Sequence, residues 1–262
     1  MVKNVLLVAS CLVPVTTLAS AQVLELEGRY WPAALTATVR VTGDHAEVPS
    51  DISTINLKSD LGLKDKNLKD FRLTLLTGPN SRLRMAYVKM DYSADQNITR
   101  TILFNGQMYT VGTRVLTTLN LDYWRYGWVW EFVGGPSSKV KFGTLLEAKR
   151  ISVDAALSAP EFAPEFAPPV EEKKSFSATV PTVGLVLDIN PSQMLNIFAE
   201  VSGMSVGDKG HAWDGEAGLK LVLGSHLVVS GGYRYFDLQV NDKPDFATLK
   251  NSGPFVGAGL RL

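Results

Sequence analysis

The chain has 262 residues and carries 26 Lys and Arg side chains against 26 Asp and Glu, so its formal net charge is zero. This length fits one domain or one barrel, and the absence of a basic excess argues against a nucleic-acid binder. One cysteine, Cys11, excludes a disulfide framework within the chain. With three separated histidines in addition, we expect neither a metal site nor a cofactor.

The first 21 residues follow the pattern of a secretory signal peptide. Lys3 gives a positive start, an apolar run extends from Val5 to Leu18, and Ala19-Ser20-Ala21 offers a cleavage site. The run is shorter than the roughly 20 apolar residues that a spanning helix needs. A buried helix or anchor and a lipid attached at Cys11 are the alternatives. We expect residues 1–21 to be removed, which leaves residues 22–262 as one exported domain without cysteine.

The rest of the chain alternates between apolar and polar side chains in segments typical of β-strands, whose successive side chains point to opposite faces. Ten segments are predicted, at residues 24–41, 71–76, 82–92, 109–132, 139–157, 178–189, 194–206, 213–223, 227–238 and 254–262. Short links rich in Gly, Pro, Asn and Ser follow the second, fourth, sixth and eighth segments. Most other links are long and polar. Outer-membrane barrels have this asymmetry, whereas a β-sandwich mixes long and short links.

The segment from Trp213 to Leu223 shows the alternation most clearly. Its odd positions are apolar or small, and its even positions include Asp214, Glu216 and Lys220. This pattern suits a soluble strand with an apolar core, and equally a strand with lipid outside and a polar lumen inside.

The last segment places Val256, Ala258, Leu260 and Leu262 on one face, and it ends the chain. An exported chain that ends in such a strand resembles bacterial outer-membrane β-barrel proteins of the porin-like and OmpA or OmpW type, although the last residue is Leu262 and not the usual Phe. The resemblance covers about 240 residues and includes no short diagnostic motif. It implies an all-β, closed, antiparallel, up-and-down barrel of about ten strands, with eight possible, in the outer membrane.

Two groups of residues are assigned to the faces of this barrel. The aromatic residues are expected at the membrane interface, at the periplasmic end of the fourth segment; they are Tyr123, Trp124, Tyr126, Trp128 and Trp130. The alternation slips near Tyr123–Trp124 and near Arg150, which predicts β-bulges there. The charged residues are expected to line the lumen, either as a ladder of ion pairs or along a narrow permeation path; they are Glu25, Glu27, Arg29, Arg72, Arg82, Arg84, Arg114, Asp122, Lys141, Glu147, Glu200, Asp214, Glu216, Lys220, Arg234 and Arg261.

Catalytic constellations are weak in this sequence. His45, His211 and His226 are far apart, and neither a His with clustered Asp residues nor a His-x-Ser arrangement is present. We therefore expect no catalytic residues and no enzymatic activity.

Two long links have unusual composition. The segment from Ala159 to Lys174 repeats A-P-E-F and should be extended and poor at pairing, so that Phe162 and Phe166 either meet a partner or fold over the mouth, or the segment is a spacer. Residues 42–70 contain Ile52, Ile55, Leu57, Leu61 and Leu63, which suggests a short helix packed in or over the barrel.

The predicted function is a structural, adhesive or porin-like role in the outer membrane, with membrane lipid as surroundings and small solutes as candidate cargo. A soluble periplasmic lipocalin-like binding barrel and an outer-membrane hydrolase are the alternatives. A protein partner is not indicated.

Overall fold

The computed structural model describes residues 23–43, 49–135, 137–160 and 170–262. The fold is all-β. Ten long strands form the barrel: β1 (Leu24–Arg40), β3 (Lys66–Gly78), β4 (Ser81–Asn97), β7 (Arg114–Val133), β8 (Val140–Ala159), β9 (Val170–Ile189), β10 (Leu195–Ser205), β11 (Gly210–Leu223), β12 (Leu227–Asp242) and β13 (Asp245–Arg261). Short elements accompany them: α1 (Ser50–Ser53), β2 (Thr54–Asn56), β5 (Ile102–Phe104), β6 (Gln107–Tyr109) and the 3-10 turn η2 (Gly207–Lys209). Within the described residues, no helix is long and apolar enough to cross a membrane.

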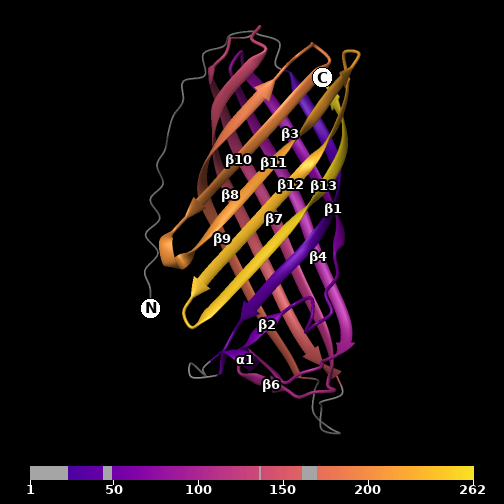
Figure 1. The fold of residues 1–262 in the computed structure, drawn as a ribbon, viewed down its shortest axis with the longest axis vertical. Coiled ribbons are helices and arrows are strands. Elements are labelled where there is room, and N and C mark those ends of the chain that lie inside the picture. Colours follow the sequence, from indigo (N-terminus) through magenta and orange to yellow (C-terminus); the bar gives the residue numbers. More distant parts are fainter. Residues whose placement is uncertain (1–22, 44–48, 136, 161–169) are drawn as a thin grey trace.

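Each long strand pairs antiparallel with its neighbours along the chain, and β13 pairs with β1 to close the barrel. The predicted closed up-and-down barrel of ten strands is therefore confirmed (Figure 1). The turns that follow β3, β7, β9 and β11 lie at one end of the barrel together with the start of β1 and the end of β13, and we call this the turn end. The turn between β12 and β13, which we expected to be a long link, is short and points the other way. The opposite end, with α1, β2 and β6, is the loop end. Most strands extend further toward the loop end than the sequence indicated, since β9 begins at Val170 and β13 at Asp245.

An apolar belt covers the outer surface near the turn end. On β11 the outward residues from Trp213 to Leu223 are apolar or small, and Leu219 is 51% exposed. Neighbouring strands contribute further exposed apolar side chains: Leu26, Phe71, Leu83, Trp128, Leu146, Leu185, Val201, Tyr233 and Val256. About ten residues per strand suffice to cross the hydrocarbon of a bilayer. A closed barrel with such a belt satisfies the backbone of its spanning strands in lipid.

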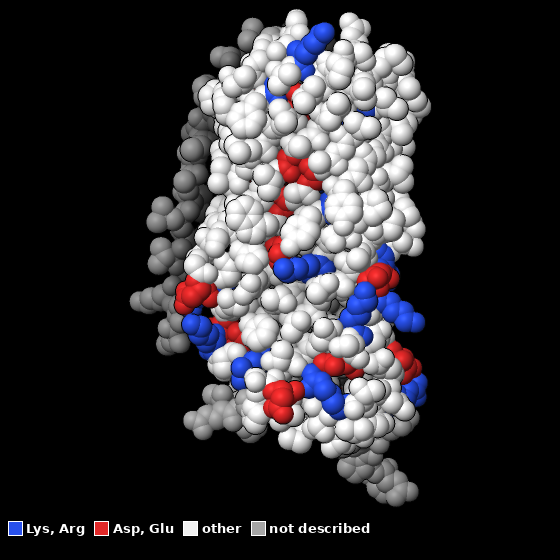
Figure 2. Space-filling model, viewed as in Figure 1, with Lys and Arg blue, Asp and Glu red and all other residues white. Residues whose placement is uncertain are grey.

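A ring of outward polar residues bounds this belt on the side of the loop end. Strand pairing aligns its members, with Lys69 opposite Lys89 and Lys89 opposite Asp122. The polar ring consists of Lys69, Lys89, Asp122, Arg150, His211, Asp237 and Lys250. Figure 2 shows charged side chains gathered over the loop-end part of the visible face, while the turn-end part is mostly free of them. The barrel therefore continues beyond the belt as a water-facing tube, which we call the outer half.

The interior changes from charged to apolar side chains at the level of the polar ring. Inside the belt the side chains are charged and buried, such as Glu27 and Arg72. Inside the outer half they are apolar, including Leu35, Met90 and Leu121. In the strands that run through both halves, the inward face is thus polar within the belt and apolar in the outer half. Both solvent arrangements that the alternation allowed occur in this barrel, one in each half.

Residues of the first long link cover the loop end. Ile55, Leu57, Leu61 and Leu63 are buried in the apolar core, next to α1 and β2. Arg100 fastens the link by donating to the Thr54 carbonyl (2.6 Å) and to Asp60 Oδ2 (2.5 Å). Burial acts to raise the pKa of Asp60, but the hydrogen bonds from Arg100 and from the Asn56 backbone N–H, together with the charge of Arg100, outweigh it, and the pKa lies below its usual value. A short helix is present as α1, but it contains only Ile52 of the five apolar residues from which a helix was expected; Ile55 lies in β2, and Leu57, Leu61 and Leu63 follow it in irregular backbone.

Two sequence expectations are corrected here. No bulge occurs near Tyr123–Trp124 or Arg150, since β7 and β8 pair without a break until an irregularity between Glu131 and Val133. The described part of the Pro-rich segment pairs well, with β8 reaching Ala159 opposite Val170 of β9. Phe162 and Phe166 lie outside the described residues, as do the signal peptide and His45.

Candidate functional site in the barrel interior

Most of the charged residues that the sequence assigned to the lumen lie inside the barrel. They are Glu25, Glu27, Arg29, Arg72, Arg82, Arg84, Lys141, Glu147, Glu200, Asp214, Glu216, Lys220, Arg234 and Arg261. Five further charged residues that the sequence analysis did not assign to the lumen lie among them: Asp70, Arg125, Glu131, Lys149 and Asp188. Acids and bases are nearly balanced, as burial of charge in a narrow space requires.

Glu216 is at the centre of this network. Its side chain is fully buried, and it accepts two hydrogen bonds from Arg72 (2.7 and 2.8 Å) and two from Arg29 (3.0 and 3.1 Å). Arg29 also donates to Glu27 (3.0 Å). Charge-assisted bonds of this bidentate kind are the strongest hydrogen bonds in proteins. Four strands, β1, β3, β11 and the neighbouring β12 through Ser230, are thereby joined across the lumen.

A second layer lies nearer the polar ring. Arg234 donates to Asp70 (2.7 Å) and to Asp214 (2.8 Å), and Arg125 approaches Asp214 (3.3 Å). Tyr123 also donates to Asp214 (2.9 Å).

An aromatic layer covers this second layer of charges. The Tyr123 ring packs on Phe236, with centroids 4.8 Å apart, and the Arg234 guanidinium lies 4.7 Å from the centre of the Trp31 ring. These three aromatic residues are fully buried and separate the ion pairs from the apolar core of the outer half.

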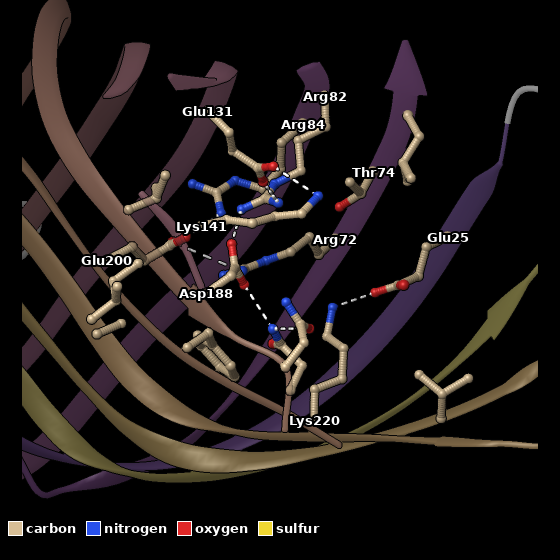
Figure 3. A pocket seen from close by; sticks show the side chains of 18 of the residues that line it. Glu25, Arg72, Thr74, Arg82, Arg84, Glu131, Lys141, Asp188, Glu200 and Lys220 are labelled. Atoms are coloured by element: carbon tan, nitrogen blue, oxygen red, sulfur yellow. Dashed lines mark hydrogen bonds and ion pairs between the residues drawn. The ribbon is translucent and has the colours of Figure 1, made fainter. Parts of the chain in front are cut away.

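A vestibule of about 220 Å³ lies at the turn end of the interior. Figure 3 shows its charged wall, in which Arg82 lies between Glu131 and Asp188 (2.6 and 2.7 Å) and Lys220 reaches Glu25 (2.5 Å). Its cationic lining residues are Arg29, Arg72, Arg82, Arg84, Lys141, Lys220 and Arg261, and its anionic ones are Glu25, Glu131, Asp188 and Glu200. Arg84 marks its deep end, where it donates to Glu200 (2.6 Å) and Glu147 (3.1 Å).

Arg114 and Asp122, which we expected in the lumen, lie on the outer face. Arg114 donates to Asp95 (2.9 and 2.8 Å) on the exposed surface, and Asp122 accepts a hydrogen bond from Tyr87. Inward positions on β7 are the odd ones, from Val115 to Glu131. The expectation failed because the apolar face of β7 changes from inward to outward where the strand enters the belt.

Four of the five aromatic residues that we expected at the interface lie on the outer face of the barrel. Trp124, Tyr126, Trp128 and Trp130 point outward, the last three between 42% and 49% exposed, and Trp128 and Trp130 lie near the turn end. Tyr123 is instead buried inside the barrel. Its hydroxyl needs a partner in an apolar layer and finds one in Asp214.

The described histidines are both outside the lumen network. His211 Nε2 lies 3.3 Å from Asp237 Oδ1 in the polar ring, where Asp237 also accepts from Tyr235 and contacts Lys250. His226 lies in the β11–β12 turn beside Ser225. Among the described residues, no group of three His, Cys, Asp or Glu side chains is arranged to hold a metal ion.

Comparison with known proteins yields structural neighbours alone. No family model and no curated protein sequence matches the chain. The outer membrane protease OmpT from Escherichia coli is similar with a TM-score of 0.52 and 8% identity, over 91% of this chain and 96% of that chain. Ail, the attachment invasion locus protein of Yersinia pestis, in complex with a heparin analogue gives a TM-score of 0.39 and 11% identity, over 92% of this chain and 99% of that chain. The toluene transporter TbuX from Ralstonia pickettii gives 0.36 and 8%, over 94% and 90%.

Identities this low show the fold alone, and one fold serves many functions. The similarity to OmpT, which has a TM-score above 0.5, is a similarity of fold. The chain thus has the closed antiparallel barrel fold of bacterial outer-membrane proteins.

Proposed function

We propose that this protein is a plugged outer-membrane barrel with a structural role, in which the membrane-embedded half anchors the chain and the outer half projects from the surface. The turn end would face the periplasm, since outer-membrane barrels have their short turns there. Membrane lipid would surround the apolar belt. The observation that carries this proposal is the two-layered ion-pair network around Glu216 and Asp214, which fills the lumen beneath the aromatic layer of Trp31, Tyr123 and Phe236.

A porin-like role is the second candidate, and the vestibule favours it. Seven cationic side chains and four anionic ones line this space. A path through the barrel would therefore prefer anions. The path would have to cross the buried pairs of Arg72 and Arg234, whose charges lie within hydrogen-bond distance of carboxylates from other strands.

The proposal includes no catalytic activity. The His211–Asp237 pair faces outward in the polar ring, and the other partners of Asp237 are Tyr235 and Lys250. A His–Asp pair needs a nucleophile or an activated water in reach to act as an acid–base pair. A soluble lipocalin-like barrel is the remaining alternative, and the exposed apolar belt argues against it, since soluble monomers rarely expose such a large apolar surface.

Single-channel recording in a planar bilayer tests the plug. The purified, heat-modifiable protein is expected to insert without reproducible conductance steps, because the ion pairs fill the lumen. Reproducible open steps with anion preference would replace the structural role by the porin-like one. Good solubility in plain buffer without detergent would contradict the membrane assignment altogether.

A further inference from the structure

The outer half contains an apolar chamber, which is lined by none of the ion-paired residues of the plug. This cavity has a volume of about 270 Å³. Side chains from opposite walls line it, with Val153, Ala155 and Leu157 on β8 facing Leu238 and Val240 on β12. Its volume exceeds the ~150 Å³ of an apolar cavity that takes up benzene and stays dry when empty.

The wall of the outer half is incomplete beside this chamber. Strand β9 begins at Val170, but its pairing with β10 begins only at Val183, opposite Gly203. Strand β10 ends at Ser205, and β11 starts at Gly210 after the η2 turn. Figure 1 shows the tip of the β10–β11 hairpin about halfway along the barrel, while β8 and β9 continue toward the loop end. One edge of β9, from 170 to 182, is therefore left without a neighbouring strand.

Side-chain exposure shows that the chamber opens at this edge. Phe176 is on the inward face of β9 and lines the chamber, yet 43% of it is exposed. Leu157, on the inward face of the adjacent β8, is only 1% exposed. Lys174, also a lining residue, is exposed as well.

The exposed lining residues on the other side of the gap in the wall are Asp242 of β12 and Ala247 of β13, and the lining beneath the first long link is closed. Leu57 and Leu61 of the first long link and Phe104 of β5 line the chamber there, and all three are buried. The opening beside β9 is thus the way in. It starts at the level of the polar ring, because His211, a member of the ring, lies directly after the tip of the β10–β11 hairpin.

We infer that the chamber binds a single hydrocarbon chain of an amphiphile, which enters beside β9. Eighteen of the 26 lining residues are apolar, so burial of a chain there is favourable in proportion to the apolar area removed from water. The charged lining residues are Arg40, Lys174, Asp242 and Asp245. The entrance adjoins the surface of the proposed membrane, where acyl chains are the nearest source of hydrocarbon. Lys174 at the entrance would attract an anionic head group, such as a carboxylate. The source of the chain rests on the proposed outer-membrane location, whereas the binding itself does not.

Cysteine protection tests this inference. In a Cys11→Ser background, Phe176→Cys places a thiol at the entrance, and Ser177→Cys places one on the next residue, which is exposed on the opposite face of β9. The protein is inserted into phosphatidylcholine vesicles and treated with a charged thiol reagent, with and without dodecanoate. Dodecanoate is expected to slow modification of Phe176→Cys at least tenfold and saturably, and to leave Ser177→Cys unchanged.

Filling the chamber provides the matched control. Ala155→Trp in the Phe176→Cys background should abolish the protection, whereas Ser158→Trp, on the outward face of the same strand, should preserve it. Protection that already exists in the vesicles, and that Ala155→Trp removes, would identify membrane lipid as the source; protection only after addition of dodecanoate would identify a free fatty acid. Equal slowing at both thiols, or no slowing at Phe176→Cys, would overturn the inference. A conducting barrel would contradict the proposed plug and leave this result unaffected.

Discussion

Replacing Glu216 by alanine is expected to lower the free energy of unfolding by about 3–5 kcal/mol, the usual cost of breaking a buried ion pair from one side. The substitution leaves Arg29 and Arg72 buried, with four charge-assisted hydrogen bonds lost between them. Unfolding in denaturant, followed by the heat-modifiable shift in electrophoretic mobility, measures the effect.

Glu171→Ala is the matched control for this prediction. Glu171 pairs with Lys173 on the exposed surface of β9, with 48% of its side chain accessible. Exposed pairs contribute little, so its loss should change stability by no more than ~0.5 kcal/mol. A Glu216→Ala variant as stable as Glu171→Ala would show that the network around Glu216 does not hold the barrel together.

Leu219→Arg is expected to destabilise the barrel by about 2–4 kcal/mol, the cost of an arginine on the lipid face near the bilayer midplane. Leu219 is near the middle of the apolar run of β11 and 51% exposed. Reversible unfolding from lipid vesicles gives the difference between variant and wild type.

The same change on the outer half provides the comparison. Leu116 also points outward and is 36% exposed, but it lies beyond the polar ring on β7. Leu116→Arg should therefore stay within ~0.5 kcal/mol of the wild type, as surface substitutions in water generally do. Equal effects at Leu116 and Leu219 would contradict the position of the belt.

The sequence predicted the strand number, and it grouped the residues of 213–223 and 254–262 by face, because each of these segments keeps one pattern throughout. The run from Trp213 to Leu223 lies entirely within the belt, so its apolar face is outward throughout. The tight turns separated the strands, and their alternation with long links indicated the closed topology.

The errors concentrate on β7 for a physical reason. Leu119 and Leu121 face inward in the outer half, whereas Trp128 and Trp130 face outward in the belt. The apolar face therefore changes where the strand enters the membrane, although the backbone continues without a bulge. The prediction assumed that each face of a strand meets the same surroundings along its whole length. Under that assumption, a change of the apolar face indicates a break in the alternation, and a bulge was expected there. Because the even-numbered residues from Trp124 to Trp130 all point outward, the alternation would have placed Arg125 inside the barrel.

Asp70 and Lys149 were missed for different reasons. Asp70 precedes the predicted start of its strand at Phe71, because the charged residues around it resembled a loop. Lys149 lies beside Arg150 at the point where β8 changes solvent, and it donates to the Ser202 carbonyl (3.0 Å) across the barrel. The apolar chamber could not be predicted, because it depends on the relative lengths of β9, β10 and β11.

Site-directed spin labelling of the outer surface tests the two-solvent architecture most directly. Nitroxides replace Leu219 and Val256 in the belt, and Ser93 and Asp154 on the outer half, with the protein in lipid vesicles. The belt positions should be accessible to dissolved oxygen and protected from a water-soluble nickel complex, and the outer positions should show the opposite preference. Access of the nickel complex to Leu219 and Val256, or lipid-like behaviour at Ser93 and Asp154, would contradict this account. In it, the outer surface changes from apolar to polar at the polar ring, and the interior changes from charged to apolar at the same level.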